Sequence, residues 1–535
     1  MFLVALDRTV IGTAVPAITN SFGSLGDIGW YGAAYLITSC CFQLLFGRIY
    51  TFYHPKWVFV ISVIIFEIGS ALCGAAPTST AFIIGRAIAG LGSAGIFSGA
   101  TIIIVNIVPL HKRPMYQGFM GGIFGIASII GPLFGGALTE KTTWRWCFYI
   151  NLPVGGAVLL VLVAVLRIPW EQPAGSRSWK QQFIQLDPLG TALFLPGCVC
   201  LLLALEWGGG TYKWSNARII VLLVLAFLLL IGFCISQVMN KKYATVPIRV
   251  IKQRSILAGI IFSLCIGGIL IIMVYYLPLW FQAIKDAKPV RSGVMNLPFL
   301  LALMVAAAIT GGSITRFGYY TPALIGSSIL MSIGIGLMTT WKYNTGSNKW
   351  IGYQVIFGFG LGMGMQQPGI AAQTVLSRKD VPTGVALMFF TNALGGAIFL
   401  AVAQSVFTNR LVADLRSTLG SNLTGRIVEQ GATDIRKLTN GNAAMLRNVL
   451  IAYNDAIMKT LCVALALACA SIVGALLMEW RDVRGVRKRQ EEFLKRQEER
   501  AKAREVEKQN ALDNDHRHDG TENSLHQEDR TRAEA

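Results

Sequence analysis

Charged residues are scarce in this sequence. Asp, Glu, Lys and Arg together make up 14% of the 535 residues, whereas 53% are hydrophobic and the mean hydropathy is +0.54. A soluble domain carries charge on about a quarter of its residues. Because this chain has too little charge to cover a surface in water, we expect most of its outer surface to face lipid.

Histidine is also scarce, and the cysteines lack obvious partners. Three of the five His (His516, His518 and His526) lie in the polar C-terminal tail, so the His or Asp cluster that a membrane-embedded enzyme would need at one membrane face is missing. The ten cysteines fall inside apolar runs, and Cys198 and Cys200 have no His cluster nearby, which favours small buried side chains over metal ligands. We therefore expect no enzyme activity, no metal and no cofactor.

The net charge of +19 belongs to the apolar part of the chain. From Arg481 onward basic and acidic residues balance, so the excess of Lys and Arg lies in loops between apolar runs, where it suits contact with anionic lipid. A nucleic-acid partner would need a basic patch on a folded soluble surface, and composition argues against one. The tail 481–535 is predicted to be a charged cytoplasmic segment that is largely disordered.

The apolar runs have the length of membrane-spanning helices. A span needs about 20 residues, and on that rule the sequence predicts about fourteen spans in an all-α membrane protein. The first run contains Asp7 and Arg8 and has no basic segment before it, so it differs from a secretory signal. Its abrupt start leads us to expect a further cytoplasmic tail before it. The predicted limits are 1–19, 29–50, 57–76, 80–107, 116–138, 146–166, 187–206, 216–238, 256–282, 294–314, 320–341, 352–375, 383–406 and 456–479.

Loop charge predicts the orientation of these spans. With both termini in the cytoplasm, the inside loops carry more Lys and Arg than the short outside loops. The only Asn-x-Ser/Thr sequon, at Asn422, falls in the long loop 407–455, which this topology places outside. We therefore expect loop 407–455 to be extracellular and Asn422 to be glycosylated.

A weak internal repeat suggests two halves. Gly47–Tyr50 after the second run and Gly311–Gly318 after the tenth are both short basic turns on the predicted inner face. Two six-helix halves separated by a helix pair account for this symmetry. We predict an N-terminal bundle at 1–186, two additional central helices at 187–240, a C-terminal bundle at 241–480 and the tail beyond it.

Three glycine motifs lie inside apolar runs. Gly90–Gly95 satisfies the G-x-G-x-x-G pattern of dinucleotide sites, but no strand precedes it, so close helix packing is the better interpretation. The glycines at 358, 360, 362 and 364 form two small-xxx-small pairs on adjacent helix faces. In Gly131–Gly136, the glycines at 131, 135 and 136 surround Pro132, which predicts either an ordinary membrane kink or a functional hinge.

Some charged residues lie deep within the apolar runs. Placing Asp7, Glu67 or Arg86 in hydrocarbon costs at least about 2.5–3.5 kcal/mol, so each must face a cavity or a partner. A carrier needs protonatable groups at depth, which suggests proton coupling. A buried ion pair that only stabilises the bundle is the alternative.

Taken together, these motifs resemble the major facilitator superfamily. They are most similar to its fourteen-span drug:proton antiporter branch, in the form found among fungal toxin and secondary-metabolite efflux carriers. Tyr50 stands where the superfamily usually has an acidic residue in its gating loop. The matching segments, in order, are Leu6–Pro16, Gly47–Tyr50 with Lys56, Arg86 with Gly90 and Gly92, Gly131–Gly136, and Trp144–Gly155.

The resemblance implies a major facilitator fold and proton-coupled efflux of hydrophobic small molecules by a plasma-membrane, or alternatively vacuolar, monomer. It assigns coupling to Asp7 and Arg86, and conformational roles to Gly47, Arg48, Lys56 and the Gly131–Gly136 motif. A proton-coupled importer of a nutrient or siderophore is the alternative function, and a channel is disfavoured because no pore loop repeats. The C-terminal half also offers neutral polar groups for binding the substrate: Gln282, Gln366, Gln367, Gln373, Asn392 and Gln404.

Overall fold

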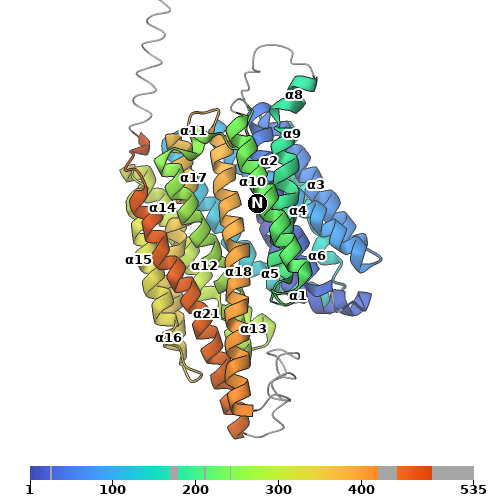
Figure 1. Cartoon of the computed structure of the whole chain (residues 1–535), viewed down its shortest axis with the longest axis vertical. Coiled ribbons are helices and arrows are strands. Elements are labelled where there is room, and N and C mark those ends of the chain that lie inside the picture. Colours follow the sequence, from blue (N-terminus) through green and yellow to red (C-terminus); the bar gives the residue numbers. More distant parts are fainter. Residues whose placement is uncertain (25–26, 169–178, 210–211, 241–242, 420–442, 485–535) are drawn as a thin grey trace, which may run out of the picture. The chain divides into compact units, whose positions relative to one another are not determined.

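Helices make up nearly all the regular structure of the computed structural model (Figure 1). The structure describes residues 1–24, 27–168, 179–209, 212–240, 243–419 and 443–484. Within these ranges no residue lies in a β-strand, and Gly208 and Tyr212 form an isolated bridge. The expected all-α fold class is therefore confirmed.

The first part of the chain contributes seven α-helices and one short 3-10 turn. The long helices correspond to the predicted spans, and the sixth expected span is divided into α6 and α7. The bounds are α1 Phe2–Phe22, α2 Ile28–Phe52, α3 Pro55–Ala75, α4 Ser79–Ile107, η2 Leu110–Lys112, α5 Arg113–Lys141, α6 Trp146–Tyr149 and α7 Asn151–Val165.

The remaining helices complete the fold. The short helices α8, α11 and α13 lie in connections, and α9 and α10 are the two expected additional helices. The bounds are α8 Trp179–Gln185, α9 Pro188–Trp207, α10 Ala217–Met239, α11 Ile248–Ile251, α12 Arg254–Lys285, α13 Pro289–Met295, α14 Leu297–Phe317, α15 Thr321–Met338, α16 Ser347–Gly364, α17 Gln367–Val375, α18 Val381–Leu419 and α21 Ala443–Leu477.

Twelve helical segments of the described residues are long and apolar enough to cross a membrane. The expected count of fourteen is not confirmed, because two predicted spans are not among these twelve. One is the first span, 1–19, which lies in α1. The other is the span 352–375, which is divided between α16 and α17 around Met365 and Gln366. Even so, the chain is a multi-pass membrane protein.

Helix packing follows the small residues. In α4, Gly90 faces α2 and Gly92 faces α3, and a Cβ at either position would overlap the neighbouring backbone. In α16, Gly358 packs against Phe299 of α14, whereas Gly360 packs against Met331 of α15. Gly362 and Gly364 repeat this alternation one turn later. The interpretation of both motifs as helix-packing surfaces is confirmed.

Two groups of helices meet along two seams. Within the first group α3 packs on α4, α4 on α2 and α1 on α5; within the second, α12 packs on α18 and α21, and α16 on α14 and α15. The seams between the groups are the contacts of α5 with α14 and of α2 with α18. The pair α9 and α10 pack on each other, and α9 also contacts α2 and α18.

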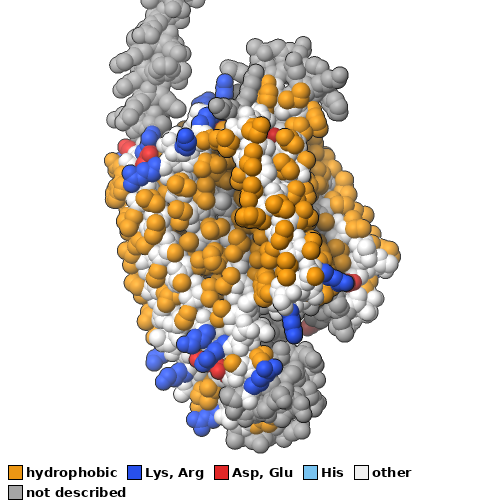
Figure 2. All heavy atoms as spheres, viewed as in Figure 1, with side chains coloured by type: hydrophobic (Ala, Val, Ile, Leu, Met, Phe, Trp, Pro, Cys, Tyr) orange, Lys and Arg blue, Asp and Glu red, His pale blue; other side chains and the backbone are white. Residues whose placement is uncertain are grey.

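Apolar side chains cover the outside of the described helices. On α10, Val221, Phe227 and Leu228 are each at least 60% exposed. Figure 2 shows hydrophobic side chains over the middle of the visible face, with Lys and Arg gathered towards its two ends. This distribution is the one that a lipid environment requires.

Asp187 fixes the start of α9. Its carboxylate, at the N-cap, accepts hydrogen bonds from the Gly190 N–H at 3.0 Å, the Gln237 side chain at 2.7 Å and the Thr245 hydroxyl at 2.9 Å. Its backbone adopts the left-handed conformation, with φ of 53°. Burial alone would favour the protonated acid, but these hydrogen bonds together hold the pKa of Asp187 below its ordinary value. The additional helix pair is thereby tied to the segment that leads into α11.

The expected loop 407–455 is shorter than predicted. Helix α18 continues to Leu419 and α21 begins at Ala443, so both flanks of that segment are helical and run side by side (Figure 1). The expectation failed because these flanks are polar enough to resemble a loop. Arg410 of α18 pairs with Asp414 of the same helix at 3.1 Å and with Asp455 of α21 at 2.8 Å, and the second ion pair joins the two extended helices. Asn422 lies outside the described residues.

Contacts along the chain group Met1–Arg481 into one unit and Asp482–Ala535 into a second. Of the second unit the structure describes only residues 482–484. The predicted disordered tail therefore lies almost wholly outside the described residues.

Candidate functional site

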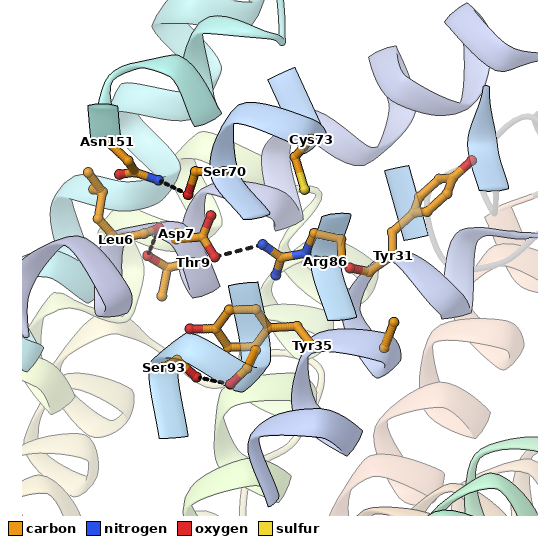
Figure 3. A network of polar contacts seen from close by, with 12 residues as sticks. Leu6, Asp7, Thr9, Tyr31, Tyr35, Ser70, Cys73, Arg86, Ser93 and Asn151 are labelled. Carbon is orange, nitrogen blue, oxygen red and sulfur yellow. Dashed lines mark hydrogen bonds and ion pairs between the residues drawn. The ribbon is translucent and has the colours of Figure 1, made fainter. Parts of the chain in front are cut away.

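Asp7 of α1 and Arg86 of α4 form a buried ion pair (Figure 3). Arg86 Nη1 lies 2.6 Å from Asp7 Oδ2, and the two side chains are no more than 1% exposed. Arg86 Nε also donates a hydrogen bond of 2.9 Å to the Tyr31 carbonyl. Asp7 Oδ1 has no hydrogen-bond partner among the described residues. The structure thus joins two of the three charged residues that the sequence singled out.

Aromatic packing holds the Arg86 guanidinium in place. Its carbon lies 4.5 Å from the centre of the Tyr35 ring, which α2 places beside the ion pair, as Figure 3 shows. The close approach of α2 and α4 at Gly90 makes this possible, because a side chain there would overlap the Tyr35 carbonyl. Arg86 is therefore held by a carboxylate, a carbonyl and an aromatic face at once.

Glu67 lies near this pair but does not join it. It belongs to α3, is 8% exposed, and neither carboxylate oxygen has a hydrogen-bond partner among the described residues. Its carboxylate contacts Gly155 of α7, where any side chain would overlap it. Asp7 is close enough to repel it electrostatically. Two acidic groups and one Arg thus share this part of the first helix group.

A cavity of about 660 Å³ lies between the two helix groups. Residues from α1, α2, α4 and α5 line it on one side, and residues from α12, α14 and α18 on the other. Aromatic rings and methionines, among them Phe97, Phe389 and Met388, make up much of its wall. Asp7, Glu67 and Arg86 do not line it, so the ion pair lies beside the cavity rather than in it.

Four of the six predicted polar groups line this cavity: Gln282, Gln366, Asn392 and Gln404. The other two do not. The Gln367 side chain donates to the Met363 carbonyl at 2.9 Å, and Gln373 is buried with neither amide atom paired among the described residues. Gln366 and Gln367 are neighbours at the start of α17, so they point in different directions.

The sequence reasoning missed two charged residues of the cavity wall, Arg8 and Glu206. Arg8 follows Asp7 directly, and the sequence motif assigned a role to Asp7 but none to Arg8. Glu206 stands at the last position of the predicted span 187–206, where a carboxylate reads as the polar end of a helix. A carboxylate at the end of an otherwise apolar helix was the available signal.

The Gly131–Gly136 motif packs α5 against α1. A Cβ at Gly131 would overlap Thr9, and one at Gly135 would lie 2.5 Å from Thr13 Oγ1 and 3.1 Å from the Val10 carbonyl. Pro132 lies inside the continuous helix α5 and lines the cavity. At Gly136 the nearest atom to an added Cβ is 3.6 Å away, which is ordinary contact. The tight positions are therefore Gly131 and Gly135.

The basic segment Gly47–Tyr50 was expected as a turn after the second span, but it lies within the last turns of α2, at a seam between the helix groups. A Cβ at Gly47 would overlap the Cβ of Ala386 in α18. The buried Arg48 guanidinium lies 4.7 Å from the Phe52 ring, and its Nε and Nη2 have no hydrogen-bond partner among the described residues. Lys56 instead donates to the Val163 carbonyl at 2.8 Å, which ties α3 to α7.

Tyr50 stands at the position where an acidic residue was expected, and it makes a hydrogen bond instead of an ion pair. Its hydroxyl donates a hydrogen bond of 2.9 Å to the Gly95 carbonyl of α4. This bond stays within the first helix group. Tyr50 therefore joins α2 to α4 and makes no charged latch to the second group.

A multi-pass helical protein with an apolar cavity between two helix groups has the architecture of a membrane transporter. The family model described as Major Facilitator Superfamily matches residues 1–400. The chain belongs to this superfamily, which confirms the resemblance seen in its motifs.

Named fungal efflux pumps are similar to this chain along most of its length. The MFS-type efflux pump MFS1 of Arthroderma benhamiae is 51% identical over 91% of this chain and 90% of its own. The rubrofusarin-specific efflux pump aurT of Gibberella zeae is 50% identical over 91% of this chain and 88% of its own. The efflux pump aflT of Aspergillus parasiticus is 47% identical over 90% of this chain and 94% of its own.

Solved structures support the fold. The crystal structure of the human organic anion transporter MFSD10 (TETRAN) aligns with a TM-score of 0.57 over 89% of this chain and 97% of its own. The identity is 14%, so this likeness shows the fold alone. The expected major facilitator fold is confirmed.

Proposed function

We propose that this protein exports hydrophobic small molecules, such as toxins, drugs or secondary metabolites, in exchange for protons. The observation that carries the proposal is the largely apolar cavity between the two helix groups, with the buried Asp7–Arg86 pair beside it. Aromatic walls with a few amide groups suit a bulky molecule of little charge. The similarity to named fungal efflux pumps supports the outward direction.

Transport proceeds by rocking of two bundles, 1–186 and 241–480, around the cavity, with the additional helices 187–240 between them. The contacts of α5 with α14 and of α2 with α18 support this division, because they form the seams along which the bundles would slide. Gly47, Arg48 and the Gly131–Gly136 motif act at these seams and at the α1–α5 contact, whereas Lys56 stabilises the first bundle.

Proton coupling belongs to Asp7 and Arg86, with Glu67 in a secondary role. Protonation of Asp7 would remove the charge that holds Arg86, and the guanidinium would then need another partner. Because α1 carries both Asp7 and the cavity residues Arg8 and Thr9, a change in the ion pair can reach the cavity wall within one helical turn. This proximity supports coupling between proton and substrate binding.

The substrate site comprises the cavity amides Gln282, Gln366, Asn392 and Gln404. They come from α12, α18 and the α16–α17 junction and would give hydrogen bonds amid apolar walls. Gln367 and Gln373 do not line the cavity, and for Gln367 we propose a role in holding α17 against α16 through its hydrogen bond to Met363. In the cell the protein acts as a monomer in the plasma membrane or the vacuolar membrane, with both termini in the cytoplasm and a glycan on Asn422.

Transport in liposomes tests the proposal. Purified protein is reconstituted, a pH gradient is imposed, and uptake of a hydrophobic fluorescent dye is followed. An antiporter accumulates dye when the lumen is the more acidic side, whereas a proton-coupled importer accumulates it when the lumen is the more alkaline. With one proton exchanged per dye, one pH unit supports about ten-fold accumulation. Accumulation only with an alkaline lumen would assign the importer function instead.

A further inference from the structure

The additional helix α9 forms part of the cavity wall. Leu202, Leu205 and Glu206 of this helix line the cavity together with residues of the two helix groups. Helix α9 reaches this position because it packs on both α2 and α18. It therefore contributes side chains that a twelve-helix arrangement would lack.

Glu206 presents its carboxylate to the cavity from the end of α9. The next residue, Trp207, packs edge-on against Trp30 of α2, with 5.6 Å between ring centres, which fixes this end of the helix. Gly29 of α2 faces the carboxylate, and a Cβ there would lie 3.4 Å from Glu206 Oε1. No hydrogen bond or ion pair joins Glu206 to another residue in the described parts of the chain. Its acceptors are thus free for a molecule in the cavity.

Charge is rare in this wall. Among the described lining side chains only Arg8 and Glu206 are charged. Arg8 lies 5.9 Å from the centres of the Tyr35 and Phe97 rings. Tyr275 of α12 also lines the cavity. A ligand therefore meets one strong acceptor and one strong donor in a mostly apolar space.

We propose that Glu206 is a specificity-determining residue, which accepts a hydrogen bond from a hydroxyl or amino group on an otherwise aromatic or apolar substrate. This inference rests on the proposed export function. A molecule that fills the cavity but lacks such a donor removes water from the carboxylate and leaves it unpaired, and sites of this kind discriminate strongly against the analogue. The additional helix thereby takes part in selecting the substrate.

Equilibrium binding to purified protein tests the proposal without any pH gradient. Hydroxypyrene and methoxypyrene are fluorescent probes of the same skeleton, and only the first has a hydrogen-bond donor. We expect the protein to bind hydroxypyrene about ten-fold more tightly than methoxypyrene near neutral pH, because a hydrogen bond to a charged acceptor has this strength. In Glu206→Gln the preference should fall to about two-fold or less, with methoxypyrene affinity unchanged. Glu206→Asp should keep part of the preference.

Controls separate binding from folding and from transport. Glu140→Gln, at the end of α5 and outside the cavity, should keep the full preference, and unchanged methoxypyrene binding by Glu206→Gln shows that this variant is folded. Equal affinity of the unmodified protein for both probes, or no binding of hydroxypyrene, would overturn the proposal. So would a full preference retained by Glu206→Gln. Failure of pH-driven export would count against the proposed function and would leave this binding result standing.

Discussion

Replacing Asp7 by Asn should separate a coupling role from a structural one. The substitution keeps an oxygen that can accept from Arg86 but removes the charge, so the guanidinium stays buried without a counter-ion. Removing one partner of a buried pair costs about 3–5 kcal/mol. The retained hydrogen bond and the contacts of Arg86 with the Tyr31 carbonyl and the Tyr35 ring should hold the cost near the lower end of that range.

We expect Arg86→Ala to destabilise the protein more than Asp7→Asn does. This variant leaves the Asp7 carboxylate without its only described partner and also empties the space above the Tyr35 ring. Asp7→Asn should therefore insert and bind substrate, whereas Arg86→Ala should be the less stable of the two. Both variants should lose pH-driven transport. Asp7→Asn has no carboxylate to protonate at this position, and in Arg86→Ala protonation of Asp7 no longer breaks an ion pair.

Three measurements on each variant decide the matter. Expression in the membrane and thermal unfolding of the purified protein report the structural cost, equilibrium dye binding reports the cavity, and liposome transport under a pH gradient reports coupling. We expect Asp7→Asn to retain dye binding while its pH-driven accumulation disappears. Full pH-driven transport by Asp7→Asn would refute the coupling role. Loss of expression together with loss of binding would assign the pair a structural role only.

Four further outcomes are expected. Gly135→Leu should impair transport while the adjacent Gly136→Leu is tolerated, because Gly135 is in tight contact with α1 and Gly136 is not; equal effects on transport of the two well-expressed variants would contradict this. Asn422→Gln should abolish the endoglycosidase-sensitive gel shift, and labelling of this segment only after permeabilisation would overturn the outside assignment. Glu67→Gln should reduce transport less than Asp7→Asn, since neither Glu67 carboxylate oxygen has a partner to release among the described residues; a complete loss would move the coupling role to α3. Asp187→Ala should lower stability by about 3 kcal/mol through lost hydrogen bonds to a charged acceptor. Because the folded-state pKa of Asp187 is depressed, its contribution is present above about pH 4 and is lost as pH falls further, which unfolding measured against pH will show.

Much of the fold was predictable because it depends on pattern. Apolar runs of about 20 residues predict helices whatever their neighbours are. The glycines at 358, 360, 362 and 364 predict two packing faces from helical periodicity alone, and α14 and α15 occupy those faces. The span count was less secure, because the predicted span 352–375 is divided between α16 and α17 at Met365 and Gln366. Neighbouring helices decide whether such a break interrupts a span.

The types of residue in the candidate site were predictable from the sequence, but only some of the residues that face the cavity were. A carboxylate and an Arg at depth require partners, so the Asp7–Arg86 pair follows from the cost of isolated charges in lipid. Which amides face the cavity depends on how each helix is rotated, and composition carries no information on rotation. Gln366 and Gln367 differ by one position, yet only Gln366 lines the cavity. The position of Glu206 in the cavity wall was not predictable for the same reason, since composition does not show whether α9 contacts the cavity or only lipid.

The placement of charge beside the cavity and within its wall suggests a division of tasks. Asp7 and Arg86 are fully buried and do not line the cavity, so a substrate in the cavity cannot contact them. The pair can therefore respond to protonation without binding the substrate directly. Arg8 and Glu206 line the cavity and can contact a substrate, and among the described residues neither side chain has an ion-pair partner. Helix α1 carries both Asp7 and Arg8, so a shift of this helix that follows protonation would move a cavity charge directly. Coupling through one rigid helix then requires no chain of intermediate residues, and exchanging the positions of the two charges by the double substitution Asp7→Arg and Arg8→Asp should abolish it.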